Sequence, residues 1–238
     1  MMLLVDAGNT RVKWALVDDD AAPGSWRAHG AGLHAELDRM APGWIGCTRA
    51  LISNVAGPLL RERIAAALPA GIAVEWFAST PERAGLRNGY REPARLGCDR
   101  FAAAIGARAL APGQDLIVAT CGTATTVDAV SADGVFIGGM ILPGLALMAS
   151  SLARNTAQLP QVAAGRAIPP LFGDNTDDAI VAGCLSAQAG AIERAVAGHG
   201  ARVCIVSGGA APSIAPALKV DYRAVDNIVL VGLQAAAR

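Results

Sequence analysis

Three glycine-containing turns, each directly after an apolar run, hold the residues best suited to bind phosphate. They are Asp6-Ala7-Gly8-Asn9-Thr10 with Lys13 beyond it, Cys121-Gly122-Thr123-Ala124-Thr125, and Ser207-Gly208-Gly209-Ala210. Glycine lets backbone N–H groups approach phosphate oxygens closely, and a carboxylate such as Asp6 can hold Mg²⁺ directly or through water. Each turn alone is better explained as an ordinary hairpin or strand–helix turn. The ordered set, with an acid and a lysine in the first turn, favours a nucleotide site.

A second group of polar residues runs from Tyr90 to Arg100 and ends in Gly97-Cys98-Asp99-Arg100. Asp99 falls in the first turn of a helix predicted over about 98–110. A small-molecule kinase needs a carboxylate that accepts the proton of a substrate hydroxyl. A carboxylate at a helix start also suits the helix dipole, so the spacing alone leaves both interpretations open. Thr176 likewise precedes a helix predicted over about 177–197, where an N-cap role explains it without any ligand.

The elements that must position these residues repeat in the two halves of the chain. An apolar run, a Gly/Thr turn and an alternating segment predict a hairpin over residues 3–17 and another over 116–130. Further strands and helices alternate along the chain, which indicates an α/β fold. A break at Ala111-Pro112-Gly113 predicts two domains, 1–113 and 114–238. The uncharged stretch from 135 to 153 predicts a buried strand, a turn and a helix start rather than a membrane span.

Composition excludes several classes of protein. The 238 residues include 20 basic and 20 acidic side chains, a balance that argues against a nucleic-acid binder. The five cysteines have no CxxC spacing, and the first residues lack a basic segment typical of a signal peptide, so we expect a cytoplasmic protein. Neither the GxxxxGK[ST] phosphate loop nor the GxGxxG dinucleotide motif occurs.

Together these residues resemble the type III pantothenate kinases, members of the actin-like superfamily of acetate and sugar kinases. The resemblance rests on four blocks and covers nearly the whole chain. The matching residues are Asp6, Gly8, Asn9, Thr10 and Lys13 of DxGNTxxxK, Tyr90, Gly97, Asp99 and Arg100 of Y…GxDR, Gly122, Thr123, Ala124 and Thr126 of GTAxT, and Gly208 and Gly209 of a late Gly-Gly. The family also shares the Leu142-Pro143-Gly144 segment.

The resemblance implies two ribonuclease H-like domains and transfer of the ATP γ-phosphoryl group to pantothenate, the first step of coenzyme A synthesis. Asp99 would accept the hydroxyl proton, and Asp6 would bind Mg²⁺. The ATP-binding residues implied are Asp6, Gly8, Asn9, Thr10, Lys13, Gly122, Thr123, Gly208 and Gly209. The pantothenate-binding residues implied are Tyr90, Gly97, Cys98, Asp99, Arg100 and Thr176. Thr176 would come from the second subunit of a homodimer with shared active sites.

One position departs from the family pattern. Many members have an aspartate, a ligand of K⁺ or NH₄⁺, two residues before the glycine of the GTA motif, and this chain has Thr120 there. A hydroxyl and carbonyls can still coordinate K⁺, but the anionic ligand is absent. Two alternative functions stay open from the sequence. One is a nucleotide-binding regulatory protein without kinase activity, as for a relative described as an accessory factor for virulence gene expression. The other is a kinase for a different small hydroxy acid or sugar.

Overall fold

The computed structural model describes residues 1–163 and 168–238, and its contacts divide into two compact units. Unit 1 comprises residues 1–112, 134–136 and 227–238, and unit 2 comprises residues 113–133 and 137–226. The division falls close to residue 113, where the sequence predicts a boundary. It differs in the helix near residue 230, which the sequence assigns to the second domain and which packs within unit 1.

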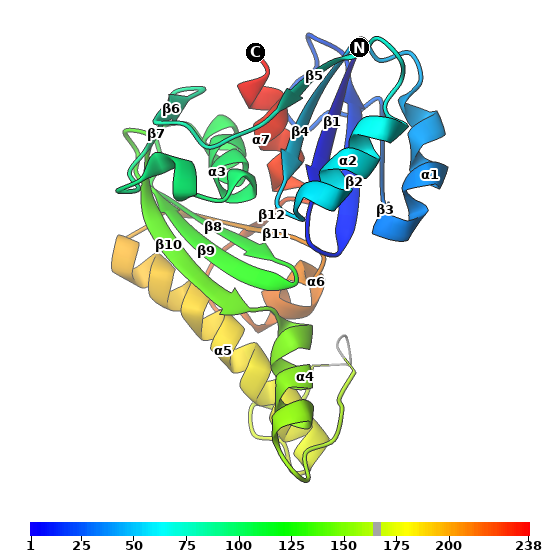
Figure 1. Cartoon of the computed structure of the whole chain (residues 1–238). Coiled ribbons are helices and arrows are strands. Elements are labelled where there is room, and N and C mark those ends of the chain that lie inside the picture. Colours follow the sequence, from blue (N-terminus) through cyan, green and yellow to red (C-terminus); the bar gives the residue numbers. More distant parts are fainter. Residues whose placement is uncertain (164–167) are drawn as a thin grey trace. The chain divides into compact units, whose positions relative to one another are not determined.

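Unit 1 is built on a mixed five-stranded sheet in the order β3-β2-β1-β4-β5 (Figure 1). Its strands are β1 (Met2–Ala7), β2 (Arg11–Val17), β3 (Ala28–Leu33), β4 (Arg49–Asn54) and β5 (Ala73–Trp76). The β1–β2–β3 pairs are antiparallel, and β4 and β5 continue parallel to β1. The predicted hairpin over residues 3–17 is therefore confirmed. β1 is buried at every residue because both of its faces are covered, as its unbroken apolar run indicates.

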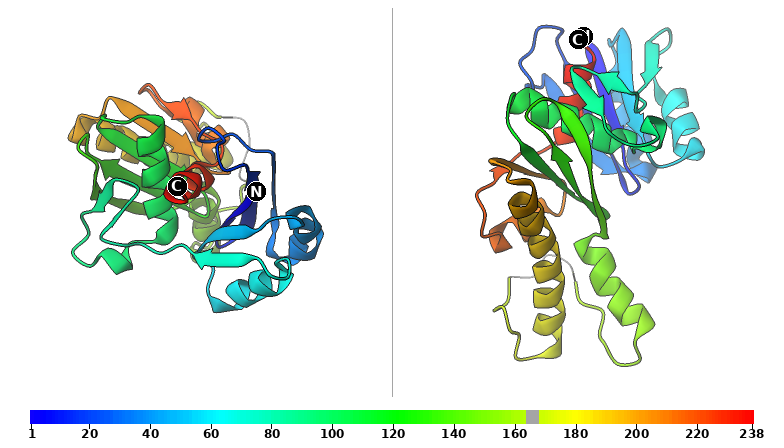
Figure 2. Two further views of the ribbon diagram at one scale, coloured as in Figure 1. Left: turned by 90° about the horizontal axis from the view of Figure 1, so that it is seen from above. Right: turned by 90° about the vertical axis from the view of Figure 1, so that its left-hand side faces the viewer.

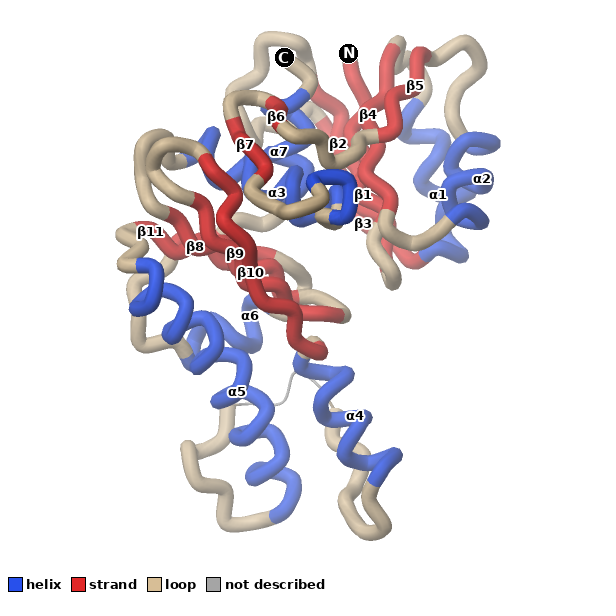
Figure 3. Tube along the Cα trace, turned by 60° about the vertical axis from the view of Figure 1, so that its left-hand side comes forward, coloured by secondary structure: helices blue, strands red, loops and turns tan. Residues whose placement is uncertain are grey.

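Unit 2 repeats the same strand order with its own elements. Its strands are β8 (Leu116–Cys121), β9 (Ala124–Val130), β10 (Val135–Pro143), β11 (Val203–Ser207) and β12 (Arg223–Ala224). They form part of a seven-stranded sheet in the order β12-β11-β8-β9-β10-β7-β6, in which β8 is antiparallel to β9 and parallel to β11. The first two residues of β10, and the short strands β7 (Leu86–Asn88) and β6 (Glu82–Arg83) beyond it, belong to unit 1. Figure 3 shows β8, β9, β10 and β11 side by side, and the long helix α5 (Thr176–His199) packs on β8 and β9. The order β10-β9-β8-β11-β12 within this sheet matches the order β3-β2-β1-β4-β5 of unit 1, which confirms the predicted pair of ribonuclease H-like halves.

Helices flank both sheets. The remaining helices are α1 (Leu37–Met40), α2 (Pro58–Ala67), α3 (Cys98–Leu110), α4 (Leu145–Asn155), α6 (Ala211–Ile214) and α7 (Ile228–Ala236). Leu3, Val5, Trp44 and Ile64 belong to the core beneath α1 and α2 in unit 1. Among the described residues, no helix has the length and apolar character needed to cross a bilayer.

β10 differs from its prediction as a buried strand. Phe136 is fully buried, but Ile137 and Ile141 are 51% and 66% exposed. Hydrophobicity alone could not reveal this difference, because an apolar strand can be covered by its own chain or by another molecule. The turn and the helix predicted after this strand are confirmed by Gly144 and α4.

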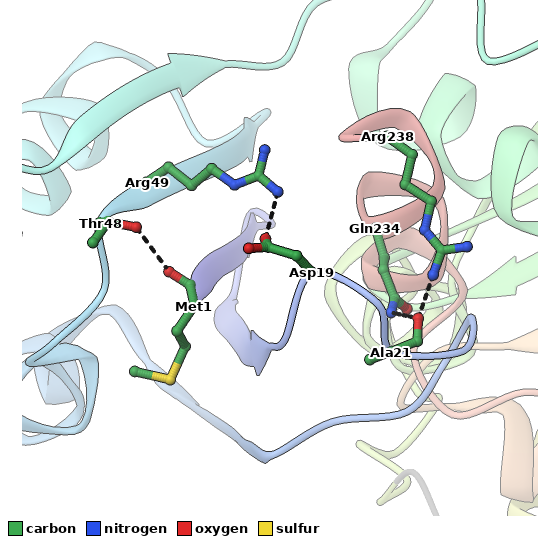
Figure 4. A network of polar contacts seen from close by, with 7 residues as sticks. All are labelled: Met1, Asp19, Ala21, Thr48, Arg49, Gln234 and Arg238. Carbon is green, nitrogen blue, oxygen red and sulfur yellow. Dashed lines mark hydrogen bonds and ion pairs between the residues drawn. The ribbon is translucent and has the colours of Figure 1, made fainter.

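The helix α7 completes unit 1 by packing on α3, and Figure 2 shows the two helices (red and green) side by side. The two backbones meet at Gly106 and Gly232, where neither helix carries a side chain. The buried Gln234 ties α7 to the loop after β2, since its side chain donates to the carbonyls of Ala21 and Ala22 and accepts from Gly24 N–H. Arg238 also donates to Ala21, as Figure 4 shows together with the Arg49–Asp19 ion pair of the same unit.

Candidate active site

The first glycine turn joins β1 to β2 and places an acid beside a lysine. Asp6 and Lys13 are opposite each other in the antiparallel register, and Lys13 Nζ lies 3.8 Å from Asp6 Oδ2. The turn is closed by the Gly8 N–H donating to the Arg11 carbonyl at 3.0 Å, and Asn9 and Thr10 are exposed at its tip. The Gly8 carbonyl is held by His34 Nε2 at 2.8 Å. The sequence analysis missed His34, because an isolated histidine 26 residues away has no informative spacing.

Asp99 lies in the first turn of α3, as predicted, with Gly97 at the N-cap. Its Oδ1 accepts the Arg100 N–H at 2.8 Å, which turns the carboxylate back over the helix start. A Cβ at Gly97 would lie 2.7 Å from that same Oδ1, a distance that real Cβ atoms essentially never show. Glycine is therefore required at residue 97 for Asp99 to hold this position.

A short contact links the two acidic segments. Ser53 on β4 is fully buried and pairs with Asp6 in the parallel register of β1 and β4. Its hydroxyl lies 3.3 Å from the thiol of Cys98, which also donates to the Asn54 carbonyl at 3.7 Å. Cys98 directly precedes Asp99. The ends of β1 and β4 and the start of α3 therefore meet in one place and bring Asp6 and Asp99 within electrostatic reach.

Burial sets the protonation of both acids. It raises the pKa of Asp6 to about 6, with Lys13 opposing the rise and the Asp99 charge adding to it. Burial also raises the pKa of Asp99, against the opposing effects of the Arg100 N–H and guanidinium. An acid with a raised pKa is a stronger base than an ordinary carboxylate once it is ionised. The two acids are thus suited to different roles, Asp99 as a proton acceptor and Asp6 as a ligand for a cation.

Tyr90 and Arg100 form the second half of the site in unit 1. Arg100 is 7% exposed, and its Nη1 donates to the Tyr90 hydroxyl at 2.7 Å. Asn88 fixes the Tyr90 backbone by accepting its N–H at 3.1 Å. The Arg100 guanidinium and the Tyr90 hydroxyl, fixed in this way, are suited to bind an anionic group such as a carboxylate. In unit 1 the structure therefore brings together Asp6, Lys13, Tyr90, Gly97, Cys98, Asp99 and Arg100.

The second and third glycine turns meet in unit 2. Gly208 has a φ of 98° and follows β11, and a Cβ there would lie 2.8 Å from the Cys121 nitrogen. The Ala210 N–H donates to the Cys121 carbonyl at 2.9 Å, which joins the two turns. Gly122, Thr123 and Gly209 are exposed at the tips of these turns. Gly144 of the Leu-Pro-Gly segment donates its N–H to Thr123 at 2.9 Å and fits against the same backbone.

Thr120 lies on β8 one residue before the second turn. It faces Thr126 across the β8–β9 pair, and within the part of the chain that the structure describes neither buried hydroxyl has a hydrogen-bond partner. Two unpartnered buried hydroxyls cost stability unless water or an ion satisfies them. They offer neutral oxygen ligands where the family pattern has an acid.

Thr176 is the first residue of α5, but it is not the cap. The side chain of Asn175 accepts the Asp178 N–H at 3.0 Å, so Asn175 is the N-cap and the cap interpretation of Thr176 is wrong. The exposed Thr176 lines a groove of about 850 Å³ between α4 and α5 in unit 2. Leu147, Met148 and Leu152 line it as well, so its walls are mostly apolar.

Comparison with known protein families gives a match over residues 2–198 to the family described as type III pantothenate kinase. A protein named type III pantothenate kinase from Herminiimonas arsenicoxydans is 58% identical and aligns with 100% of this chain and 97% of its own. One of the same name from Janthinobacterium sp. (strain Marseille) is 57% identical with the same coverage. A third, from Aromatoleum aromaticum, is 49% identical over 100% of this chain and 98% of its own.

Solved structures with low identity share the fold. An activator of 2-hydroxyisocaproyl-CoA dehydratase from Clostridium difficile with bound ADPNP has a TM-score of 0.55 at 13% identity, covering 99% of this chain and 92% of that chain. A glucokinase from an Antarctic psychrotroph has a TM-score of 0.51 at 16% identity, covering 98% and 97%. The chain therefore has the same fold as these two proteins.

Proposed function

Because the chain belongs to the type III pantothenate kinase family, we propose that it transfers the γ-phosphoryl group of ATP to the primary hydroxyl of pantothenate. The products are 4′-phosphopantothenate and ADP, in the first step of coenzyme A synthesis. The observation that carries this proposal is the meeting of Asp6 and Asp99 where β1, β4 and α3 converge. Phosphoryl transfer requires mainly positioning and charge stabilisation, which such a site can supply.

Asp99 is the proposed catalytic residue. The pantothenate hydroxyl oxygen attacks the γ-phosphorus and the bond to the ADP oxygen breaks, while the hydroxyl proton passes to the Asp99 carboxylate. The raised pKa of Asp99 favours this proton acceptance. Arg100 and Tyr90, joined by their 2.7 Å hydrogen bond, are proposed to bind the pantothenate carboxylate. Gly97 and Cys98 complete this binding segment.

The glycine turns are proposed to bind ATP. In unit 1 the binding residues are Asp6, Gly8, Asn9, Thr10 and Lys13, and in unit 2 they are Gly122, Thr123, Gly208 and Gly209. The tips of such glycine turns let a phosphate approach the backbone closely. The Asp6 carboxylate fits Mg²⁺, which proteins usually hold by one or two carboxylates together with substrate phosphates. When bound, Mg²⁺ neutralises charge on the phosphates.

The Thr120 and Thr126 hydroxyls fit a monovalent cation, because both are buried oxygens that lack a partner among the described residues. We propose that they hold K⁺ or NH₄⁺ more weakly than a carboxylate would, since they bring no charge. Thr120 is thus the point at which this chain departs from the family in ion binding.

A homodimer is proposed from the apolar surface around Thr176. Leu147, Leu152, Leu171 and Phe172 are exposed on and near α4 and α5, and Phe172 is 87% exposed. A second copy of the chain would bury them, and Thr176 would then contact pantothenate bound to its partner. Exposed apolar side chains of this size often mark interaction sites. We also propose a cytoplasmic location, because all five cysteines are free thiols and suit a reducing compartment.

Direct detection of phosphopantothenate from purified protein, ATP, Mg²⁺ and pantothenate tests the function, with other small hydroxy acids and sugars as alternative acceptors. Asp99→Asn should lower kcat by about 100-fold or more while ATP binding persists. Asp38→Asn is the matched control, since Asp38 is an exposed acid in the first turn of α1. ATP binding without any product would favour a regulatory protein. An Asp99→Asn rate within a few-fold of wild type would remove Asp99 as the base.

A further inference from the structure

Phe136 is a buried ring beside the proposed substrate-binding residues, and neither the sequence motifs nor the family blocks include it. It is the second residue of β10, belongs to unit 1 and is 0% exposed. Its ring centroid lies 5.6 Å from that of Tyr90, with the planes at 65°, an edge-to-face arrangement. The same ring lies 5.6 Å from Arg100 Cζ. Phe136 therefore touches both residues of the proposed carboxylate site.

The three side chains form one closed cluster, in which each member contacts the other two. Arg100 Cζ also lies 5.6 Å from the Tyr90 ring, and its Nη1 donates to the Tyr90 hydroxyl. The guanidinium is thus held by its hydrogen bond to Tyr90 and lies over the rings of Tyr90 and Phe136. Cation–π contacts strengthen when the cation is desolvated, and Arg100 is buried.

The backbone of Phe136 holds the same segment from the other side. Its carbonyl accepts the Gly89 N–H at 2.9 Å, one residue before Tyr90. β10 and β7 are parallel here, with Phe136 opposite Asn88, whose side chain accepts the Tyr90 N–H. A Cβ at Gly89 would collide with the Phe136 carbonyl, so glycine permits this approach. Tyr90 is therefore fixed to Phe136 through both its backbone and its ring.

We propose that Phe136 is a positioning residue that holds the Arg100 guanidinium and the Tyr90 hydroxyl in the geometry that binds the substrate carboxylate. This inference rests on the proposed function, since it assumes that Arg100 and Tyr90 bind the acceptor. Arginine loses much rotamer freedom when it is immobilised, and a side chain ordered before binding removes that loss from the binding step. Loss of the ring should therefore weaken binding of the acidic acceptor and leave the ATP side unaffected.

The test compares Phe136→Leu with Phe77→Leu in the same kinase assay. Phe77 is a matched control, because it is also buried in unit 1, stacks on another ring (Phe101) and lies under an arginine (Arg83, 4.9 Å), yet it lies outside the proposed site. Phe136→Leu should raise the KM for pantothenate about five- to tenfold, with the KM for ATP and kcat within about twofold. Phe77→Leu should leave both KM values within about twofold.

Tyr90→Phe provides a second measurement if Phe136→Leu folds poorly. It keeps the ring and removes the hydrogen bond to Arg100, and it should raise the pantothenate KM alone. Combined with Phe136→Leu, its effect should be less than the product of the two single effects, because both act on one guanidinium. A wild type without product overturns the proposed function. An active wild type whose Phe136→Leu and Phe77→Leu variants change the pantothenate KM equally, or not at all, overturns the positioning role only.

Discussion

The contact between α3 and α7 offers a prediction whose magnitude can be worked from backbone geometry. A Cβ at Gly106 would lie 2.6 Å from the Ile228 carbonyl oxygen and 2.7 Å from the Gly232 nitrogen. Real Cβ atoms essentially never come within 3.0 Å, and both neighbours are helix backbone that cannot rotate away. A Cβ at Gly232 would overlap the Ala102 carbonyl outright. Gly106→Ala and Gly232→Ala must therefore push the two helices apart.

The expected effect combines two opposing contributions. Overpacking a tight core contact costs about 1–3 kcal/mol, and replacing a helical glycine by alanine returns up to about 1 kcal/mol. We expect Gly106→Ala to destabilise unit 1 by about 1–2 kcal/mol and Gly232→Ala by more. Gly190→Ala is the control, since Gly190 is an exposed residue inside α5 with nothing within 4 Å of its Cβ position. That variant should gain up to about 1 kcal/mol.

Hydrogen exchange is the suitable assay, because a chain with two units need not unfold in one step. Amides of α3 and α7 should exchange faster in Gly106→Ala and Gly232→Ala, and amides of α5 should not change. Because α3 begins with the segment that carries Asp99 and Arg100, the pantothenate KM should rise as well. Unchanged protection of α3 in both variants, or a gain like that of Gly190→Ala, would refute the close approach of the two helices.

Three further predictions follow from the site. Burial raises the pKa of Asp6 to about 6, so between pH 4 and 6 the folded state keeps a proton that the unfolded state releases, and the free energy of unfolding of ligand-free wild type should fall by up to about 3 kcal/mol. Asp6→Asn should remove this fall and abolish turnover, whereas parallel curves of stability against pH for the two proteins would contradict the prediction. Thr120→Asp should lower the K⁺ concentration for half-maximal activity by about tenfold, whereas an unchanged value would separate Thr120 from ion binding. Asn175→Ala should destabilise α5 by about 1 kcal/mol, whereas Thr176→Ala should raise the pantothenate KM and leave the stability of α5 unchanged. Faster hydrogen exchange of α5 in Thr176→Ala, with an unchanged pantothenate KM, would show that Thr176 caps the helix instead.

The sequence predicts the parts of the fold that repeat a local pattern. Both hairpins were predictable because alternating side chains from Val12 to Leu16 and a Gly/Thr turn specify a strand pair locally. β6 and β12 have two residues each, too few for any period. The exposure of Ile137 and Ile141 was not predictable, because apolar residues in a strand indicate burial but do not show whether the same chain or another molecule covers them.

The site was predictable where its residues are consecutive and missed where they are brought together by the fold. Asp99 and Arg100 follow Gly97 directly, so one helix start identifies them. Ser53 and Phe136 are single residues in apolar strands, and only the pairing of β4 with β1 and of β10 with β7 brings them to the site. The membership of α7 in unit 1 depends on a glycine contact more than a hundred residues apart in sequence.

The placement of α7 in unit 1 has a consequence for the order of assembly during synthesis. Residues 113–226, which include all of unit 2, leave the ribosome before the segment that covers α3. At about 5–20 residues per second this delay is on the order of ten seconds. During that time the face of α3 that carries the fully buried Phe101 and Ala102 lacks its final packing partner. Unit 1 is therefore begun first during synthesis and completed last. The first turn of α3 holds Asp99, and this helix reaches its final packing only after α7 has been made.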